Sequence, residues 1–392
     1  MYATGRRSPK PAPEVRGPIQ SFFVKVVVIG AGVIGCAVAY ELAARGAQVQ
    51  VVDPRPIAGG ATHASAGMLA PYSEGHDPAL LRLGLASLAL YDDFVARVRH
   101  DSPRAFDYER SGTLQVAAGK TEQERLAEQA RMLAAANVAH RWVDRHAAHD
   151  LEPALGDGID AGLLLPDQGY INATGFTMAL ADAAERRGAR FTAARVSGLS
   201  SGSGQERARG VRINTSDGPI EGDTLVLAAG SWSSAIAGVT TWPAPVTPIR
   251  GQLLHLRASA RLASRIVWGG SCYVVPWSDG TVLVGATVED AGFDEHPTAQ
   301  GVRHLLDAVH TLLPAADAAM FGEVRVGLRP KTPDELPIIG SSSTMRGVVH
   351  ATGHYRNGIL LTPLTAVLVA DLLLDRREDE ALELTKPARF GL

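Results

Sequence analysis

Cysteine is scarce in this sequence, with Cys36 and Cys272 the only two among 392 residues. Two cysteines are too few for a disulfide framework or a multi-cysteine metal site, and their scarcity fits a reducing compartment. Long hydrophobic runs are also missing, because no apolar stretch reaches the ~18 residues that a membrane span needs. We therefore expect a cytoplasmic protein that does not associate with a membrane.

An excess of one charge is absent as well. The 38 Lys and Arg residues nearly balance the 41 Asp and Glu residues, which leaves a formal net charge of −3. Nucleic-acid-binding proteins usually have a basic surface, so this class is disfavoured. Hydrophobic residues make up 46% of the chain, too many for a disordered protein. Glycine, in contrast, is abundant, because 41 residues are more than a tenth of the chain against a usual ~7%.

Residues 1–24 predict a disordered basic tail. Arg6 and Arg7 would suggest a twin-arginine export signal. Prolines follow them where such a signal needs an apolar segment, so this interpretation fails.

The region after this tail has the pattern of a strand, a helix and a second strand. Residues 26–29 are a continuous apolar run, as in a strand buried on both faces of a parallel sheet. Residues 33–45 predict a helix that ends before Gly46, and residues 48–52 predict the second strand. Such a unit in about 30 residues begins a doubly wound α/β domain.

Further elements follow along the chain. We predict amphipathic helices at 80–98, 121–138 and 174–190, strands at 211–214 and 224–229 joined across a turn at 216–218, a polar loop at 199–209, two strands within 271–288, and a C-terminal helix from Thr362 to about Leu374. Thr362 is expected to cap this last helix, with Pro363 in the first helical position.

A glycine-rich turn joins the first strand to the first helix. Gly30 permits a tight turn, Gly32 lets backbone approach a pyrophosphate, and Gly35 lets the helix pack on the strand. The helix N-terminus offers N–H donors to the phosphates. Asp53, at the end of the second strand, can accept from both ribose hydroxyls and would repel a 2′-phosphate, so NADP is disfavoured. The motif alone does not separate NAD from FAD.

Residues 59–71 contain almost no bulky side chain, which suits backbone that passes close to a large flat ring. Here the sequence resembles the FAD-dependent amine and amino-acid oxidoreductases of the D-amino-acid oxidase superfamily, and within it the glycine oxidase group. The resemblance runs from about Val26 to about Leu374. It depends on separated motifs: GAGVIG (30–35), GGATHASAGMLAP (59–71), LVLAAGSWS (225–233), PIRGQLL (248–254), CYVVP (272–276), GLRPKTPDELPIIG (327–340) and ATGHYRNGILLTP (351–363).

This resemblance implies FAD as the cofactor. The implied FAD-binding residues are Gly30, Gly32, Val33, Ile34, Gly35 and Asp53 toward the adenosine and pyrophosphate, Thr62, Ser65, Ala66, Gly67 and Met68 along the isoalloxazine, Ala229 and Gly230 on a second strand, and Gly353, Arg356, Asn357, Gly358 and Ile359 before the C-terminal helix. The N-terminus of that helix would stabilise an anionic reduced flavin. Non-covalent attachment is expected, because Gly327 stands where related sarcosine oxidases have the linking cysteine, and His63 is out of register with the histidine that other relatives use.

The resemblance also implies a substrate site. Oxidation at an α-carbon depends mainly on positioning, and the planar fork of arginine matches a carboxylate. Arg329 lies in the apolar run 326–330, where an unpaired charge would be costly, and matches the family's carboxylate-binding arginine. Tyr273 matches the active-site tyrosine and Arg356 an arginine at the mouth of the site. The alternatives are a structural salt bridge for Arg329 and strand packing for Tyr273, and we expect His354 to be structural.

The sequence departs from the family's pattern at residues 269–271, Gly-Gly-Ser. Glycine oxidases have a polar or basic residue shortly before the tyrosine, and small residues there would leave space. We therefore expect glycine or an N-substituted glycine as substrate, with the substituent in that space. No metal is expected, because His146 and His149 have no further ligands at usable spacing.

The sequence thus predicts an FAD-dependent oxidase. By the resemblance, hydride transfer to flavin N5 gives an imine that water hydrolyses, and dioxygen is reduced to hydrogen peroxide, in thiamine or secondary-metabolite biosynthesis. The partners would be the small-molecule amino acid and dioxygen, and a homo-oligomer is compatible with the sequence. The main alternative is a D-amino-acid or imino-acid dehydrogenase that passes electrons to a quinone. A flavin-binding interaction protein and a nicotinamide dehydrogenase are further alternatives.

We expect two domains. One is an α/β, Rossmann-type FAD-binding domain with a parallel sheet, and the other is a substrate-binding domain with a mostly antiparallel sheet and flanking helices. The first would comprise residues 25–100, 165–243 and 327–376, the second residues 101–164 and 244–326, and residues 377–392 would form a C-terminal tail.

Overall fold

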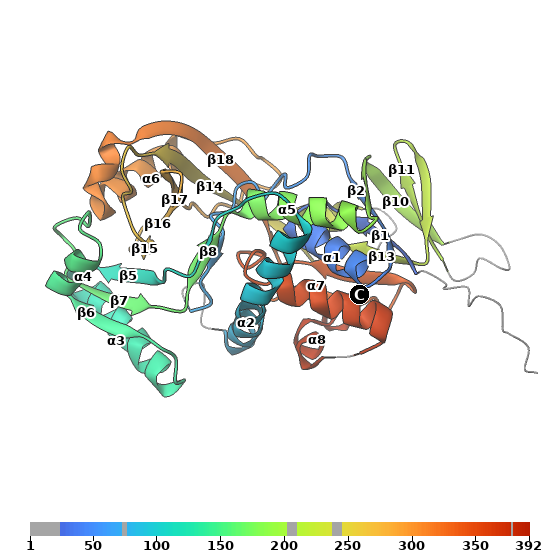
Figure 1. The fold of residues 1–392 in the computed structure, drawn as a ribbon, viewed down its shortest axis with the longest axis horizontal. Helices are drawn as coiled ribbons and strands as arrows, with labels where there is room; N and C mark the ends of the chain where they lie inside the picture. The colour runs from blue at the N-terminus through green and yellow to red at the C-terminus, as the bar shows by residue number, and fades with distance from the viewer. Residues whose placement is uncertain (1–23, 73–76, 202–209, 237–244, 378) are drawn as a thin grey trace, which may run out of the picture.

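Two large β-sheets stand side by side in the computed structural model, each with its own helices (Figure 1). The structure describes residues 24–72, 77–201, 210–236, 245–377 and 379–392. Nearly all of the expected N-terminal tail, and most of the expected polar loop at 199–209, lie outside these residues. Over the described ranges, no helix combines the length and the hydropathy that a membrane span requires.

The first sheet has six strands in the order β19-β20-β13-β1-β2-β9, all parallel to their neighbours except β19. Its strands are β1 (Lys25–Ile29), β2 (Gln48–Asp53), β9 (Arg190–Ala193), β13 (Thr224–Leu227), β19 (Ile338–Ser341) and β20 (Val348–Thr352). Val26, Val27 and Val28 have no exposed surface, because side chains on both faces of β1 are covered. The prediction of a Rossmann-type parallel sheet is confirmed.

Different elements cover the two faces of this parallel sheet. One face carries α1 (Val33–Ala44), α2 (Pro78–Asp101), α5 (Ala173–Arg186) and α7 (Thr362–Ala370), whose apolar residues form one core with the sheet. The other face carries a three-stranded sheet of β10 (Val196–Ser201), β11 (Val211–Thr215) and β12 (Gly218–Gly222), where Ile213 packs in one cluster with Val27 and Ile29.

The topology corrects one predicted pairing. Strand β11 forms its hairpin with β12, and the strand predicted at 224–229 is β13, which lies in parallel register between β1 and β20. The turn at 216–218 is present but leads into β12. Strand β12 has a single bulky apolar residue, Ile220, so it lacks the alternation that identifies a strand.

The second sheet has eight strands in the order β18-β14-β17-β16-β15-β5-β7-β6, antiparallel except between β15 and β5. Its strands are β5 (Thr113–Ala117), β6 (Arg141–Asp144), β7 (Ala161–Leu165), β14 (Thr247–Arg257), β15 (Ile266–Trp268), β16 (Tyr273–Pro276), β17 (Thr281–Gly285) and β18 (Met320–Lys331). The helices beside it are α3 (Gly119–Ala135), α4 (Arg145–Leu151) and α6 (Ala299–Leu312), followed by the short η2 (Pro314–Ala318). Strands β16 and β17 form the hairpin predicted within 271–288.

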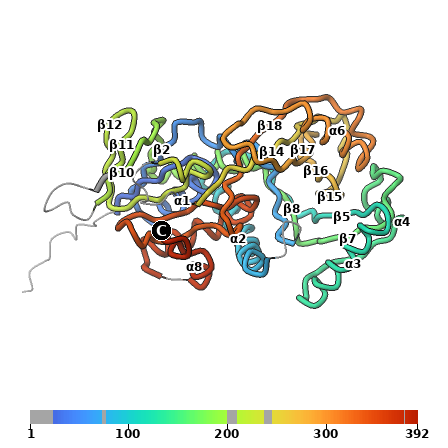
Figure 2. Tube along the Cα trace, turned by 180° about the vertical axis from the view of Figure 1, so that it is seen from behind, coloured from blue at the N-terminus to red at the C-terminus, as the bar shows by residue number. Residues whose placement is uncertain are grey.

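A small sheet of β3 (Met68–Leu69), β8 (Gly169–Ile171) and β4 (Tyr108–Glu109) lies between the two large sheets. Figures 1 and 2 show β8 in this position from opposite sides. Strand β18 runs across the domain boundary expected at residue 327, and β7 runs across the one expected at residue 165. Arg329 therefore belongs to the eight-stranded sheet, contrary to the expected boundary.

The C-terminal region differs from the sequence prediction in two ways. Thr362 begins α7, but its hydroxyl donates to the carbonyl oxygen of Gly358, and the N-cap residue is Leu361. Helix α7 is followed by η3 (Asp371–Asp375), α8 (Glu380–Thr385) and η4 (Pro387–Phe390). The expected C-terminal tail is thus folded, because Leu382 is buried in the core of the parallel sheet and Leu392 packs against other buried side chains.

Candidate functional site

A cavity of about 550 Å³ opens where the two large sheets meet. One wall comes from the carboxyl ends of β1, β2, β13 and β20 and the segments that follow them. The other wall comes from β14, β17 and β18 and from residues 268–273. Ligands of open α/β sheets bind outside the carboxyl ends of the strands, so this cavity is the candidate site.

Most of the predicted cofactor and substrate residues line this cavity. They are Gly30, Gly32, Val33, Ile34, Asp53, Thr62, Ser65, Ala66, Gly67, Met68, Ala229, Gly230, Tyr273, Arg329, Arg356, Gly358 and Ile359. Gly35, Gly353 and Asn357 were predicted as cofactor residues but do not line it. A Cβ on Gly35 would collide with the carbonyl group of Gly30, so Gly35 permits close packing of α1 on β1. Asn357 is buried, and its backbone holds the loop through bonds to His354 and Leu361.

Backbone groups form the dinucleotide part of the cavity. Gly30 has a φ of 111°, and a Cβ there would collide with the carbonyl oxygen of Ala228. Helix α1 begins after Gly32, which has no side chain to cap it, and its first turn contains no acidic residue. The Val33 N–H donates to the Thr62 hydroxyl oxygen at 3.1 Å, so this hydroxyl lies beside the positive end of the helix.

Asp53 is held at the end of β2 by two backbone donors. Its Oδ2 accepts from the Ala31 N–H at 2.8 Å and its Oδ1 from the Arg55 N–H at 2.8 Å. A carboxylate has about four acceptor positions, so capacity remains for two ribose hydroxyls. With the positive end of helix α1 for the pyrophosphate, these residues fit the adenosine and pyrophosphate half of FAD.

Arg329 and Tyr273 lie over diagonal positions of adjacent strands on the wall formed by the eight-stranded sheet. The Arg329 guanidinium lies over Gly251 and the Tyr273 phenol end over Gly285, since a Cβ on either glycine would collide with them. Gly285 is paired with Leu253, which places it diagonally across from Gly251 on the adjacent strand. Such diagonal positions are about 7–8 Å apart. The guanidinium and the phenol hydroxyl can therefore reach one small anion together.

Two backbone carbonyls hold the Arg329 side chain, which is half-buried. Its Nη1 donates to the carbonyl oxygen of Thr287 at 3.0 Å and to that of Arg250 at 3.4 Å. Both acceptors are uncharged, so the cation keeps its positive charge toward the cavity. The predicted alternative, a salt bridge made by Arg329, does not occur among the described ion pairs.

The loop before α7 brings Arg356 and His354 to the cavity. Arg356 is exposed, and its guanidinium carbon lies 5.1 Å from the centre of the Tyr355 ring. His354 is buried, and its Nε2 is 3.0 Å from the Thr365 hydroxyl. Burial lowers the pKa of His354 to about 3, so its imidazole is neutral near pH 7.

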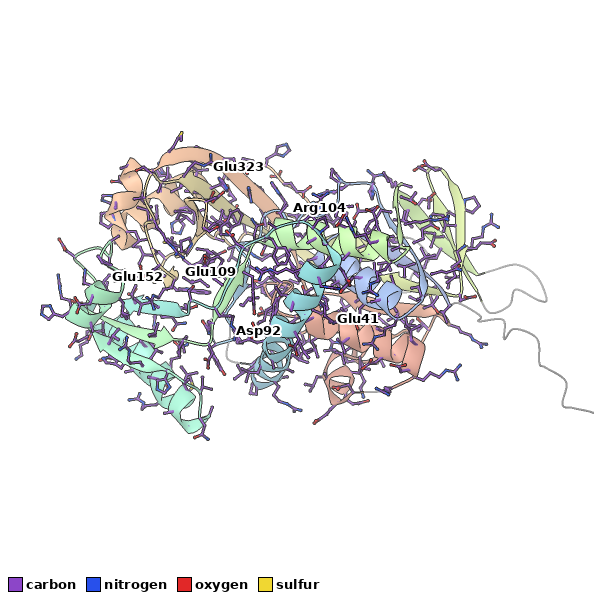
Figure 3. All side chains as sticks on the ribbon, in the orientation of Figure 1. Glu41, Asp92, Arg104, Glu109, Glu152 and Glu323 are labelled. Carbon is purple, nitrogen blue, oxygen red and sulfur yellow. The ribbon has the colours of Figure 1, made fainter. Side chains whose placement is uncertain are left out.

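Carboxylates that could serve as general acids or bases lie elsewhere. Figure 3 labels the buried Glu41 on α1 and Glu152 after α4. Glu41 accepts from Arg45 and Arg97, and Glu152 accepts from Arg265, so both carboxylates are held in structural ion pairs. Of the described residues that line the cavity, Asp53 is the one carboxylic acid. The described parts of the chain also contain no group of three His, Cys, Asp or Glu arranged for a metal ion.

The space expected at Gly269 and Gly270 is already filled. A Cβ on Gly270 would collide with the Glu122 carboxylate of α3, and a Cβ on Gly269 would lie 3.0 Å from Leu312 of α6. These glycines let the loop pack against two helices, so their small size adds no room for a substrate. Ser271, which is exposed and lines the cavity, remains the small side chain before the tyrosine.

Several residues at the cavity were not predicted from the sequence, notably Trp268, Trp232 and Arg55. The Trp268 ring lies 5.3 Å from that of Tyr273, and the Arg55 guanidinium lies 4.0 Å from the centre of the Trp232 ring. Trp232 stands inside the motif at 225–233, which is the one signal that marked it. Arg55 contacts Trp232 and Glu295, which are distant in sequence, so no local pattern indicates its position. Trp268 faces Tyr273 across the β15–β16 pair but lies outside the motifs that carry the resemblance.

The comparisons with known proteins agree with this geometry. The family model described as FAD dependent oxidoreductase matches residues 25–372. The bifunctional protein ThiO/ThiG of Nostoc sp. is 36% identical over 369 residues, which are 91% of this chain and 54% of that protein. The chain therefore spans about half the length of this relative.

Two relatives with solved structures match over nearly their whole length. Glycine oxidase from Geobacillus kaustophilus is 31% identical, and its structure superposes with a TM-score of 0.87, covering 93% of this chain and 98% of that one. Iminodiacetate oxidase from Chelativorans sp. BNC1 is 28% identical with a TM-score of 0.83, covering 92% and 98%.

Proposed function

Because this chain belongs to the FAD-dependent oxidoreductase family, we propose that it is an FAD-dependent oxidase of glycine or N-substituted glycines. The observation that carries the proposal is the adjacent placement of the Arg329 guanidinium and the Tyr273 phenol on the wall opposite the dinucleotide groove. The 31% identity to a glycine oxidase supports the same substrate class.

Each of the three polar residues has a role in this proposal. Arg329 binds the substrate carboxylate through its planar fork, and the Tyr273 hydroxyl donates a second hydrogen bond to it. Arg356, exposed at the loop before α7, shapes the mouth of the site. Together they orient the α-carbon toward the cofactor wall and exclude water around it.

Residues of the wall formed by the parallel sheet would hold FAD non-covalently. The groups that would hold it are the N-terminus of α1, Asp53, the segment 61–68 and the loop 353–359. When bound there, FAD would supply acceptance of the substrate hydride and reoxidation by dioxygen, so the expected products are hydrogen peroxide and an imine that water hydrolyses. Gly327 supports non-covalent attachment, because the space beside its Cα is filled by Ala61 and Ala64.

The substrate range of the proposal includes N-substituted glycines because Ser271 leaves the cavity open beside Tyr273. A related structure at 28% identity is that of an iminodiacetate oxidase, which supports a secondary amine as substrate. We propose thiamine biosynthesis over secondary metabolism as the setting, because the 36% identical relative is a ThiO/ThiG protein.

The test is a panel of amines and amino acids added anaerobically to the FAD-loaded protein, with loss of flavin absorbance as the readout. Glycine, sarcosine and a longer N-alkylglycine should bleach the flavin, and oxygen should then regenerate it with one peroxide per turnover. Bleaching followed by electron transfer to a dye without peroxide would instead support a dehydrogenase that uses a quinone.

A substitution tests the carboxylate site. Arg329→Ala should raise KM for glycine about 100-fold, the upper range for a lost hydrogen bond to a charged group. Unchanged KM in this variant would remove the proposed role of Arg329.

A further inference from the structure

The geometry points to residues 250–252, Arg-Gly-Gln, and Glu289 as the elements that position Arg329. This inference rests on the proposed role of Arg329 in carboxylate binding. None of these four residues has to contact the substrate through a side chain. They fix the place and direction of the guanidinium that does.

Gly251 supplies the place. It lies on β14, opposite Gly327 of β18, and the Arg329 guanidinium occupies the volume that a Cβ of Gly251 would need. Three guanidinium atoms, Cζ, Nη1 and Nη2, would all collide with that Cβ. Any side chain at this position therefore displaces the whole fork from the place in which it would bind a carboxylate.

The carbonyl groups of Arg250 and Thr287 supply the direction. Both accept from Nη1 of Arg329, at 3.4 and 3.0 Å. With Nη1 held by the backbone, the plane of the guanidinium is fixed. Bidentate binding of a carboxylate depends on this plane, because both N–H groups must point at the same anion.

Glu289 joins the residues that carry these carbonyls, and its backbone N–H donates to the Arg250 carbonyl oxygen at 2.9 Å. Its Oε2 accepts from Nη2 of Arg250 at 2.6 Å, and its Oε1 accepts from Nε2 of Gln252 at 2.7 Å and from the Thr287 hydroxyl at 2.5 Å. Burial alone would raise the pKa of Glu289, but these hydrogen bonds and the charge of Arg250 lower it. Glu289 is therefore a charged hub between β14 and the segment after β17.

The rest of the network is anchored away from the cavity. Nη1 of Arg250 donates to Asp294 at 2.7 Å, and the Gln252 side chain bonds both the backbone N–H and the hydroxyl of Thr298. Thr298 caps α6. The position of Arg329 is thus linked to the first turn of a helix on the far side of the sheet.

The test measures carboxylate binding directly, with sodium acetate as the probe and the flavin absorbance of the FAD-loaded protein as the readout. Gly251→Ala should weaken acetate binding at least about ten-fold, as expected when a hydrogen bond to a charged group is misaligned. The KM for glycine should rise in parallel, and kcat at saturation should change much less. Gly158→Ala is the matched control, because Gly158 is exposed and nothing lies within 4 Å of its Cβ position.

A double-mutant cycle separates positioning from general damage. In an Arg329→Ala background, Gly251→Ala should have no further effect on acetate binding, because no guanidinium is left to displace. An equal loss in both backgrounds overturns the inference, as does wild-type acetate affinity in Gly251→Ala. If Arg329→Ala itself binds acetate normally, the proposed function fails first.

Glu289→Gln is the second variant, and it decides the question if Gly251→Ala does not retain FAD. The amide keeps the size of the side chain but loses the charge and one acceptor oxygen. We expect a few-fold weaker binding of acetate, with normal FAD content and normal unfolding temperature. Unchanged acetate affinity in Glu289→Gln would show that Glu289 does not help to position Arg329.

Discussion

The two walls of the cavity differ in composition, because one is mainly backbone and the other mainly side chains. The wall of the parallel sheet is largely backbone: glycines such as Gly30 and Gly67, and the N-terminus of α1. The wall of the eight-stranded sheet is made of side chains, above all Arg329 and Tyr273, which lie over glycines. A backbone wall is fixed by the path of the chain, whereas a side-chain wall is fixed by its hydrogen bonds. Added atoms should therefore disrupt the backbone wall, whereas removal of polar groups should impair the side-chain wall.

The largest expected effect is on the backbone wall. Gly67 has a φ of 76°, and a Cβ there would collide with the carbonyl oxygen of Ile171. Gly67→Ala should lower the free energy of unfolding by about 3 kcal/mol, from backbone strain and overpacking together. Urea unfolding followed by tryptophan fluorescence measures this loss.

The control for this variant separates strain from collision. Gly46 has a φ of 89°, but nothing lies within 4 Å of its Cβ position. Gly46→Ala should cost about 1 kcal/mol, the strain alone. Equal losses in the two variants would contradict the argument that close backbone contact defines this wall.

The parallel sheet that carries the backbone wall should also be acid-sensitive. His350 on β20 is fully buried, and neither of its ring nitrogens has a hydrogen-bond partner among the described residues. Burial lowers its pKa to about 4 from an ordinary value near 6.5. Below pH 6.5 the unfolded chain binds a proton that the folded chain does not, so stability falls as the pH falls.

Replacing this histidine tests the effect. In the wild-type protein, the buried His350 should lower the free energy of unfolding by about 2 kcal/mol between pH 6.5 and pH 5, from about 1.4 kcal/mol per pH unit. His350→Leu should reduce the difference between the unfolding free energies at pH 7 and pH 5, measured in urea, by that amount. The loss that His354 contributes in the same way should remain. His146→Leu replaces an exposed histidine and should retain the wild-type difference. A pH dependence that His350→Leu does not reduce would show that the acid sensitivity lies elsewhere.

The elements of the two walls could be predicted from the sequence where they consist of contiguous residues. The strand, turn and helix at 25–44 were predicted closely, because their signals are local. The pairing of β13 was wrong, since a short apolar run fits a hairpin and a buried parallel strand equally well. The role of Gly251 could not be predicted, because the guanidinium that fills its side-chain position comes from a strand about 80 residues later. The same non-local packing explains the wrong expectation for Gly270, whose neighbour is Glu122 on α3.

A smaller effect is expected on the side-chain wall. Tyr273→Phe removes one neutral hydroxyl and leaves the ring over Gly285 and beside Trp268. Loss of one hydrogen bond should lower kcat/KM for glycine about two- to ten-fold. Tyr108→Phe is the control, because Tyr108 bonds Asp92 outside the cavity and its loss should leave kcat/KM unchanged. Equal kcat/KM for Tyr273→Phe and the wild type would mean that the tyrosine only packs in its strand.

The smallest effect is expected where side chains join the two walls. Arg55, which follows β2, pairs with Glu295 through two contacts of 2.9 and 2.8 Å and stacks on Trp232, which in turn contacts Phe293. Glu295 and Phe293 belong to the segment between β17 and α6, so the pair crosses from the cofactor wall to the substrate wall.

We expect Glu295→Gln to speed the release of FAD about two- to five-fold, the range for a partly exposed ion pair. The rise in FAD fluorescence after dilution measures the rate. Glu380→Gln breaks the exposed pair with Arg82 and should leave FAD release unchanged. Acetate affinity should stay at the wild-type value in Glu295→Gln, because Arg329 is positioned through Glu289. If Glu295→Gln weakened acetate binding as well as FAD retention, the two walls would depend on the same contacts. The proposed independence of the cofactor wall and the substrate wall would then be wrong.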